Sequence, residues 1–129
     1  MNRALELFES RVDRLSARDG RLEVHFSHGY IHESPGEPGS DPGTAWSQEL
    51  LVVVHEARVR DDDIHLPDDI VGGWLEAGGV RYELVPLPFS RSGGVSLRLE
   101  LRGGGTVQAT GRGVSVRLLD APIFLEDLS

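Results

Sequence analysis

The final third of the chain alternates apolar and polar residues, and this alternation constrains the fold more than any other feature of the sequence. Residues 95–101, 107–110 and 114–118 place an apolar side chain at every second position, and glycine-rich triplets at 103–105 and 111–113 separate these runs. Successive side chains of a β-strand point to opposite faces of its sheet, so this period is typical of strands with one buried face. The pattern predicts a C-terminal meander of three antiparallel strands.

A second turn signal stands near the N-terminus. Asp19-Gly20 is a two-residue sequence that favours a tight β-hairpin turn, and the residues after it alternate cleanly. We therefore expect a hairpin over residues 12–30, and a further one around Gly78-Gly79. Counting outward from Asp19-Gly20 places two pairs on one face, Ala17 with Leu22 and Leu15 with Val24.

The segment before the hairpin allows two interpretations. Leu5, Phe8, Val12 and Leu15 follow the spacing of an amphipathic helix face, whereas the Asp19-Gly20 turn favours strand pairing. We favour the hairpin, with a short helix or an irregular lead-in before it, and the sequence leaves the choice between helix and strand over residues 2–11 open. Further along, residues 49–59 are apolar on both faces and predict a covered strand, and the acidic stretch that follows is interpreted as a solvated connection.

About eight short strands separated by turn signals indicate an all-β fold. The chain of 129 residues has the usual length of one domain, and no internal repeat or second boundary is visible. We expect a single domain over residues 1–129, built as an antiparallel β-sandwich or a small barrel. The sequence leaves the choice between sandwich and barrel open.

Composition excludes several classes of function. The formal net charge of −8 and the pI of about 5.0 argue against a duplex nucleic-acid binder. With no cysteine, disulfides, thiolate catalysis and cysteine-based metal sites are excluded. All 13 basic residues are arginine, which we ascribe to codon bias in a GC-rich, bacterial genome. The N-terminal residues show no secretory signal and no apolar run reaches the ~20 residues of a membrane helix, so we expect a soluble cytoplasmic protein.

The most unusual chemistry lies between residues 21 and 48. By alternation, Leu22, Val24, Phe26, His28, Tyr30 and His32 share one face of a strand, which turns polar towards its end. Residues 34–48 then lose all periodicity and are rich in proline and glycine, which predicts a long surface loop at the rim of the sheet. Trp46 is interpreted as the anchor of this loop.

This strand end and the 34–48 loop are the predicted functional surface. Long loops on a β scaffold are a common recognition surface, so we favour a non-enzymatic binding module whose partner is a protein or a small ligand. The sequence also allows a homodimer through exposed sheet edges, and a purely structural loop remains an alternative. The candidate binding residues are His28, Tyr30, His32, Asp41, Trp46 and Gln48.

The alternative function is a metal-dependent enzyme with a site near His28 and His32. Imidazole and carboxylate are normal zinc or iron ligands, and His25 and Glu33 lie close by in the sequence. On a strand, however, His28 and His32 stand ~13 Å apart, which is too far to share one ion. No serine elbow and no phosphate loop is present. We therefore expect no metal and no cofactor, and the sequence leaves the question of enzymatic activity open.

Overall fold

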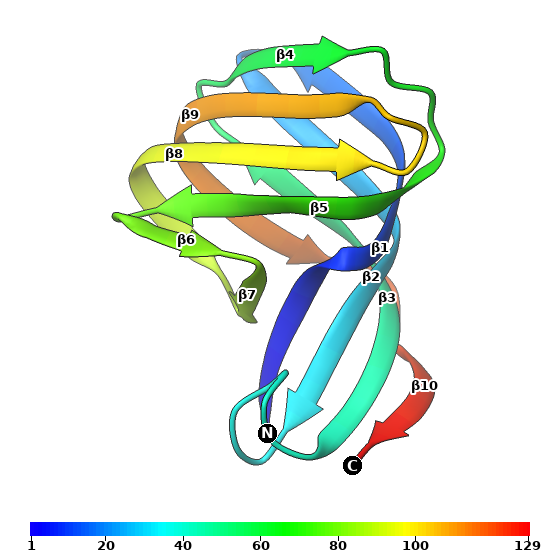
Figure 1. Cartoon of the computed structure of the whole chain (residues 1–129). Helices are drawn as coiled ribbons and strands as arrows, with labels where there is room; N and C mark the ends of the chain where they lie inside the picture. Colours follow the sequence, from blue (N-terminus) through cyan, green and yellow to red (C-terminus); the bar gives the residue numbers. More distant parts are fainter.

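The computed structural model describes residues 1–129 and contains ten β-strands and no helix (Figure 1). The all-β fold expected from the sequence is confirmed. The strands are β1 (Asn2–Arg18), β2 (Arg21–Ser34), β3 (Gly43–Val54), β4 (Arg58–Asp62), β5 (Asp68–Ala77), β6 (Val80–Tyr82), β7 (Leu84–Leu87), β8 (Ser90–Leu101), β9 (Thr106–Leu118) and β10 (Ile123–Leu128).

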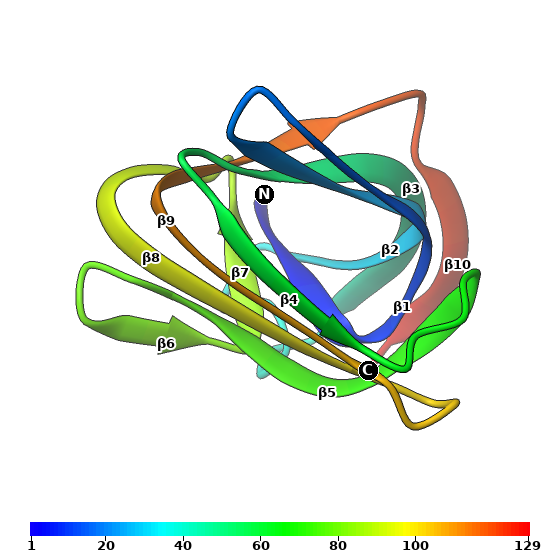
Figure 2. The same cartoon turned by 90° about the horizontal axis from the view of Figure 1, so that it is seen from above.

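Six of these strands close into a barrel. β1 pairs with β2, β2 with β3, β3 with β9, β9 with β8, β8 with β5, and β5 returns to β1, with every pairing antiparallel. The view from above in Figure 2 shows these strands arranged around one central space. Of the two architectures that the sequence left open, the structure is therefore the barrel.

The three N-terminal strands continue beyond the barrel and form a second region, which we call the extension. It consists of the first half of β1, the second half of β2 and the first half of β3, with β7 added beside β1 and β10 added beside β3. In Figure 1 the extension forms the lower part of the molecule, where both chain ends lie. A continuous core of 22 buried hydrophobic residues links the two regions, with Phe26 and Leu99 in the barrel and Leu5 and Ile31 in the extension.

The N-terminal hairpin has the predicted register. Ala17 faces Leu22 and Leu15 faces Val24 across the Asp19-Gly20 turn. The favoured helix or irregular lead-in is wrong, and of the two states left open for residues 2–11 the structure has the strand, because β1 begins at Asn2 and stays paired with β2. The helix-like spacing arose from an irregularity inside the strand, where Glu9 adopts a φ of 80° and Phe8 turns outward.

The same irregularity changes the faces of β2. Between the pairs Arg11 with His28 and Glu6 with Tyr30, β1 has four residues where β2 has only Gly29. β2 is itself irregular after Phe26, where its pairing with β3 also slips. The prediction that Leu22 to His32 share one face is therefore wrong beyond Phe26. Ile31 enters the core, and Tyr30 and His32 take the opposite face.

The predicted three-stranded meander is a two-stranded one. Residues 111–113 do not form a turn, since β9 runs unbroken from Thr106 to Leu118 and exchanges β4 for β3 as its partner. Gly111 allows the close approach of the His55 carbonyl, which a β-carbon would obstruct, so the glycines mark a barrel corner.

Two other boundaries differ from the sequence interpretation. The predicted loop over 34–48 is shorter, because β3 already begins at Gly43 and places Trp46 and Gln48 inside a strand. The acidic connection contains β4, whose side chains are all exposed. The C-terminal residues do join the sheet as β10, but Ile123, Phe124 and Leu125 remain about half exposed or more.

Candidate functional site

One face of the extension carries two rows of side chains that run across the strands. The first row holds Glu6 of β1, Tyr30 of β2 and Ser47 of β3, since residues paired directly across strands share a face. The second row holds Ala4, His32 and Ala45 on the same strands. His32 thus stands between two alanines, whose small side chains leave space beside its ring.

The His32 ring is fixed by one of its nitrogens only. Its Nε2 lies 3.1 Å from Glu6 Oε2, and the Tyr30 ring packs edge-on against it with centroids 5.2 Å apart. A carboxylate accepts hydrogen bonds and cannot donate one, so Nε2 carries the hydrogen. In the neutral imidazole the other nitrogen is then an acceptor. That atom, Nδ1, is buried and has no hydrogen-bond partner, although the side chain as a whole is 13% exposed.

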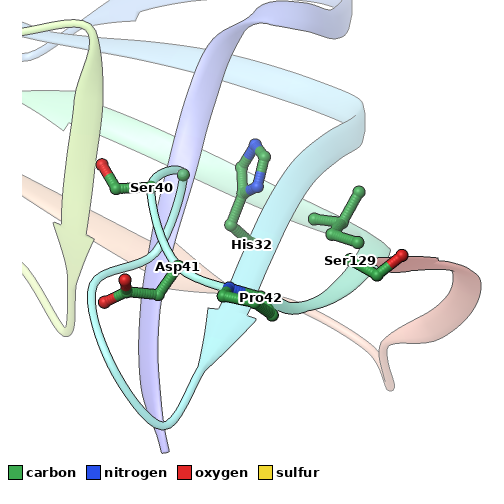
Figure 3. A pocket seen from close by; sticks show the side chains of 7 residues that line it. His32, Ser40, Asp41, Pro42 and Ser129 are labelled. Atoms are coloured by element: carbon green, nitrogen blue, oxygen red, sulfur yellow. The ribbon is translucent and has the colours of Figure 1, made fainter.

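A cavity of about 280 Å³ lies beside this ring. In Figure 3 the His32 ring stands between the loop that carries Ser40 and Pro42 and the chain end at Ser129. The Asp41 carboxylate points away from the ring in the same view. The cavity is lined by His32, Gly39, Ser40, Asp41, Pro42, Leu128 and Ser129.

The loop that forms one wall is held by its own hydrogen bonds. The backbone N–H groups of Ser40 and Asp41 donate to the Glu37 carbonyl at 3.1 and 2.8 Å, and the Asp41 carboxylate accepts the Glu37 N–H at 2.6 Å. The buried Ser34 hydroxyl donates to the Pro42 carbonyl at 2.8 Å. Asp41 therefore shapes the cavity by closing the loop, and its carboxylate does not face His32.

Gly39 joins the loop to β7. It adopts a φ of +88°, which favours glycine, and a β-carbon there would lie 2.7 Å from Leu84 Cδ1. Asn2 adds a hydrogen bond of 2.7 Å to the Gly36 carbonyl. The wall is thus tied to the sheet at both ends, so the cavity is largely preformed.

A second hollow of about 200 Å³ lies further along the same face. It is bordered by His28 and Tyr30, together with Glu9, Gly29, Ser47 and Leu125. The Tyr30 hydroxyl donates to Glu126 at 2.9 Å. Burial, this hydrogen bond and the charges of Glu126, Glu6 and Glu9 raise the pKa of Tyr30 from its ordinary value of 10.0 to about 12. The phenol therefore lies in a region of negative potential.

The remaining candidates support the extension. Trp46 lies on the opposite face, where its ring packs edge-on against Phe124 at 5.4 Å and its indole N–H donates to Thr44 at 2.8 Å. Gln48 is buried, accepts a hydrogen bond from Arg3 at 3.0 Å and donates to the Asp120 carbonyl at 2.8 Å. The structure brings neither side chain to the cavity.

The sequence analysis missed Glu6, Leu128 and Ser129 as parts of this site. Glu6 could be found only from its pairing with Tyr30, and counting from the Asp19-Gly20 turn fails because four residues of β1, 7–10, lie opposite the single Gly29. The C-terminal residues are brought to His32 by the pairing of β10 with β3. The apolar residues at the start of β10 were the one signal in the sequence that this segment joins the sheet.

A different arrangement surrounds His25 in the barrel part of β2. Its Nδ1 pairs with Asp13 of β1 and its Nε2 with Glu49 of β3 at 2.5 Å. Its side chain is 7% exposed. Both nitrogens are occupied, so this ring connects three strands and has no atom left for a ligand.

The chain contains no group of three or more histidine and carboxylate side chains arranged to hold a metal ion. His28 pairs with Ser47 at 3.1 Å and His32 with Glu6, so these two histidines do not share a site. The chain forms no helix that is long enough and apolar enough to cross a membrane. No protein-family model matches the sequence, and neither a curated protein nor a solved structure is detectably similar to it.

Proposed function

We propose that this protein is a non-enzymatic binding module that takes up a small molecule, or a side chain of a protein partner, in the cavity beside His32. The observation that carries the proposal is that the ring of His32 lines a preformed cavity while its Nδ1 is buried without a hydrogen-bond partner. Leaving a buried polar atom unpaired costs about 1–3 kcal/mol, and a ligand that pairs it recovers part of that cost.

The surroundings of the ring support a binding role. Glu6 holds Nε2 and so fixes the orientation of the ring, and the loop around Gly39 is tied to the sheet. Sites of this kind need little reorganisation on binding, which favours affinity. The absence of cysteine also suits a cytoplasmic module, because its fold does not depend on an oxidising compartment.

The alternative, a metal-dependent enzyme near His28 and His32, has no observation in its favour. The two rings have different partners and border different hollows.

A fragment screen by amide ¹H–¹⁵N NMR tests the proposal. We expect fragments that bind to shift the amides of residues 39–42 and 128–129, and we expect these shifts to disappear in His32→Phe, which keeps an aromatic ring but removes the acceptor. His65→Ala is the matched control, because His65 is exposed and distant from the cavity residues in the sequence. A screen whose hits leave these amides unmoved would refute the proposed function.

A further inference from the structure

We propose that the group bound beside His32 is a primary alkylammonium, that is, a hydrogen-bond-donating cation on a short apolar chain. This inference rests on the proposed function and names its ligand class. Three features of the cavity carry it: the acceptor role of His32, the sign of the surrounding charges, and the size and apolar lining of the cavity.

The first feature fixes the direction of the hydrogen bond. Glu6 accepts the hydrogen on Nε2, so whenever the ring is neutral its free Nδ1 offers a lone pair. A ligand that pairs this atom must donate an N–H or O–H. A carboxylate or phosphate ligand has no hydrogen to give and would leave the atom unpaired.

The second feature is that the charged side chains of this face are acidic. Glu6 pairs with the ring and Glu126 bonds to Tyr30 in the next row, whereas the Asp41 carboxylate in the loop wall points away from the ring. Desolvation is the largest cause of the raised pKa of Tyr30, and the hydrogen bond to Glu126 and the charges of Glu126, Glu6 and Glu9 add to it. A cation entering from water meets a favourable potential, and the net charge of −8 adds attraction at longer range.

The arginine of the adjacent strand position does not neutralise this face. Arg3 lies next to Ala4 on β1 and points to the opposite side of the sheet, where it contacts Glu33 at 3.8 Å and Gln48 at 3.0 Å. No lysine occurs anywhere in the chain. A side-chain ammonium for this cavity must therefore come from another molecule.

The third feature limits the size of the ligand. A volume of about 280 Å³ is at the lower end of ligand sites, which hold roughly 300–1,000 Å³. Leu128 and Pro42 give two of the walls an apolar surface. A head group with a few methylene groups fits this space, whereas a large ring system does not.

The ammonium group has two sources, a free small amine or a lysine side chain of a partner protein. Their chemistry at His32 is the same. The two sources differ because a lysine is attached to a peptide backbone, and this backbone would have to lie at the open side of the cavity.

The test compares three probes that each contain four carbon atoms in an unbranched chain. n-Butylammonium, n-butanol and butyrate are titrated separately into ¹⁵N-labelled protein at constant ionic strength, and the shifts of the amides of residues 39–42 and 128–129 are followed. We expect saturable shifts with n-butylammonium at a Kd at least 10-fold lower than with either other probe. Raising the salt concentration should weaken n-butylammonium binding and leave n-butanol unaffected.

Two variants assign the effect to the proposed atoms. His32→Phe should raise the Kd of n-butylammonium at least 10-fold, and Glu6→Gln should raise it several-fold because it removes the nearby negative charge. Glu6→Gln also carries the test if His32→Phe does not give a dispersed amide spectrum. The exposed His65→Ala should bind as the wild type does.

The remaining outcomes separate this inference from the proposed function. Tighter binding of butyrate would show that His32 acts as a donor, so the ligand class would be wrong and the binding site would stand. Equal binding of n-butanol would refute the cation requirement. If none of the three probes shifts these amides, the inference is refuted, and the fragment screen decides the proposed function independently.

Nα-acetyl-lysine methylamide, which keeps the side-chain ammonium, distinguishes the two sources. Binding as tight as that of n-butylammonium would identify a lysine of a partner protein as the source. At least 10-fold weaker binding would identify a free amine. Both results support the alkylammonium assignment.

Discussion

Two histidines of β2 face acidic side chains of β1, but only one of them keeps an unpaired nitrogen. His25, in the barrel, pairs with Asp13 on one side and with Glu49 of β3 on the other. His32, in the extension, pairs with Glu6 alone, because β3 places the small Ala45 opposite it. His25 itself faces Leu51 and reaches Glu49 two positions away on β3, so the side chains that β3 offers decide whether the second ring nitrogen is paired.

The comparison extends to the two regions themselves. The barrel is closed by six paired strands and fills its interior with apolar side chains such as Phe26 and Leu99. The extension is an open sheet, and the cavity lies on its polar face between the 35–42 loop and the end of β10. The barrel therefore provides stability, and the extension provides the surface on which function is proposed.

The largest expected effect is at His25. His25→Ala leaves Asp13 and Glu49 without their shared donor, and we expect a loss of about 2–3 kcal/mol in the free energy of unfolding, measured by urea denaturation. The loss should stay below the 3–5 kcal/mol of a fully buried pair because both carboxylates are about one-third exposed. The control His65→Ala should stay within ~0.5 kcal/mol of the wild type. A loss at His25 no larger than that of the control would contradict its role as a connection between strands.

The next effect is at Ser10, where the two regions meet. Its buried hydroxyl donates to the Glu6 carbonyl at 2.6 Å and accepts the Tyr30 N–H at 3.0 Å, in place of a backbone partner. Ser10→Ala leaves both groups unpaired and should cost about 1–2 kcal/mol in the same denaturation experiment. The exposed Ser92→Ala should cost almost nothing. Equal stabilities of the two variants would show that the irregularity in β1 does not need this hydroxyl.

A smaller effect on stability is expected at His32. Only one hydrogen bond, to the partly exposed Glu6, is lost in His32→Ala, so the free energy of unfolding should fall by about 1 kcal/mol or less. The same variant should lose the n-butylammonium response of residues 39–42. If His32→Ala destabilised the protein as much as His25→Ala, the two histidines would both be structural and the comparison would fail.

The smallest effect concerns the ionisation of Tyr30. In a Tyr82→Phe background, where Tyr30 is the only tyrosine, ultraviolet titration should give a midpoint near pH 12, and Glu126→Gln should lower it towards 10. Because the folded-state pKa lies above that of an unfolded tyrosine, the contribution of Tyr30 to stability is complete below about pH 10 and is lost as the pH rises towards 12. A midpoint near 10 in the unmutated site would remove the evidence for negative potential.

The sequence predicted the local parts of this fold well. The Asp19-Gly20 turn specifies its own hairpin, so the pairs of Ala17 with Leu22 and Leu15 with Val24 follow from two residues. The extra residues in β1 depend on distant contacts, since the Leu7 N–H is paired with the Glu83 carbonyl and Ser10 pairs with Tyr30. No pattern within β1 shows either contact.

Only part of the candidate site could be predicted, because the rest also depends on contacts between residues distant in the sequence. The row of histidines on β2 drew attention to His28, Tyr30 and His32, and the loop drew attention to Asp41. What distinguishes His32 from its neighbours is the combination of Glu6 on one side and Ala45 on the other. That combination exists only after three strands pair in a register that the irregularity has shifted.

The most direct test of the account is the protonation of the two histidine rings. Long-range ¹H–¹⁵N correlation spectra should show hydrogen on both nitrogens of His25, and on Nε2 alone of His32, with the His32 Nδ1 resonance moving when n-butylammonium is added. Hydrogen on His32 Nδ1, as the other tautomer or as the doubly protonated ring, would turn the proposed acceptor into a donor and contradict the account.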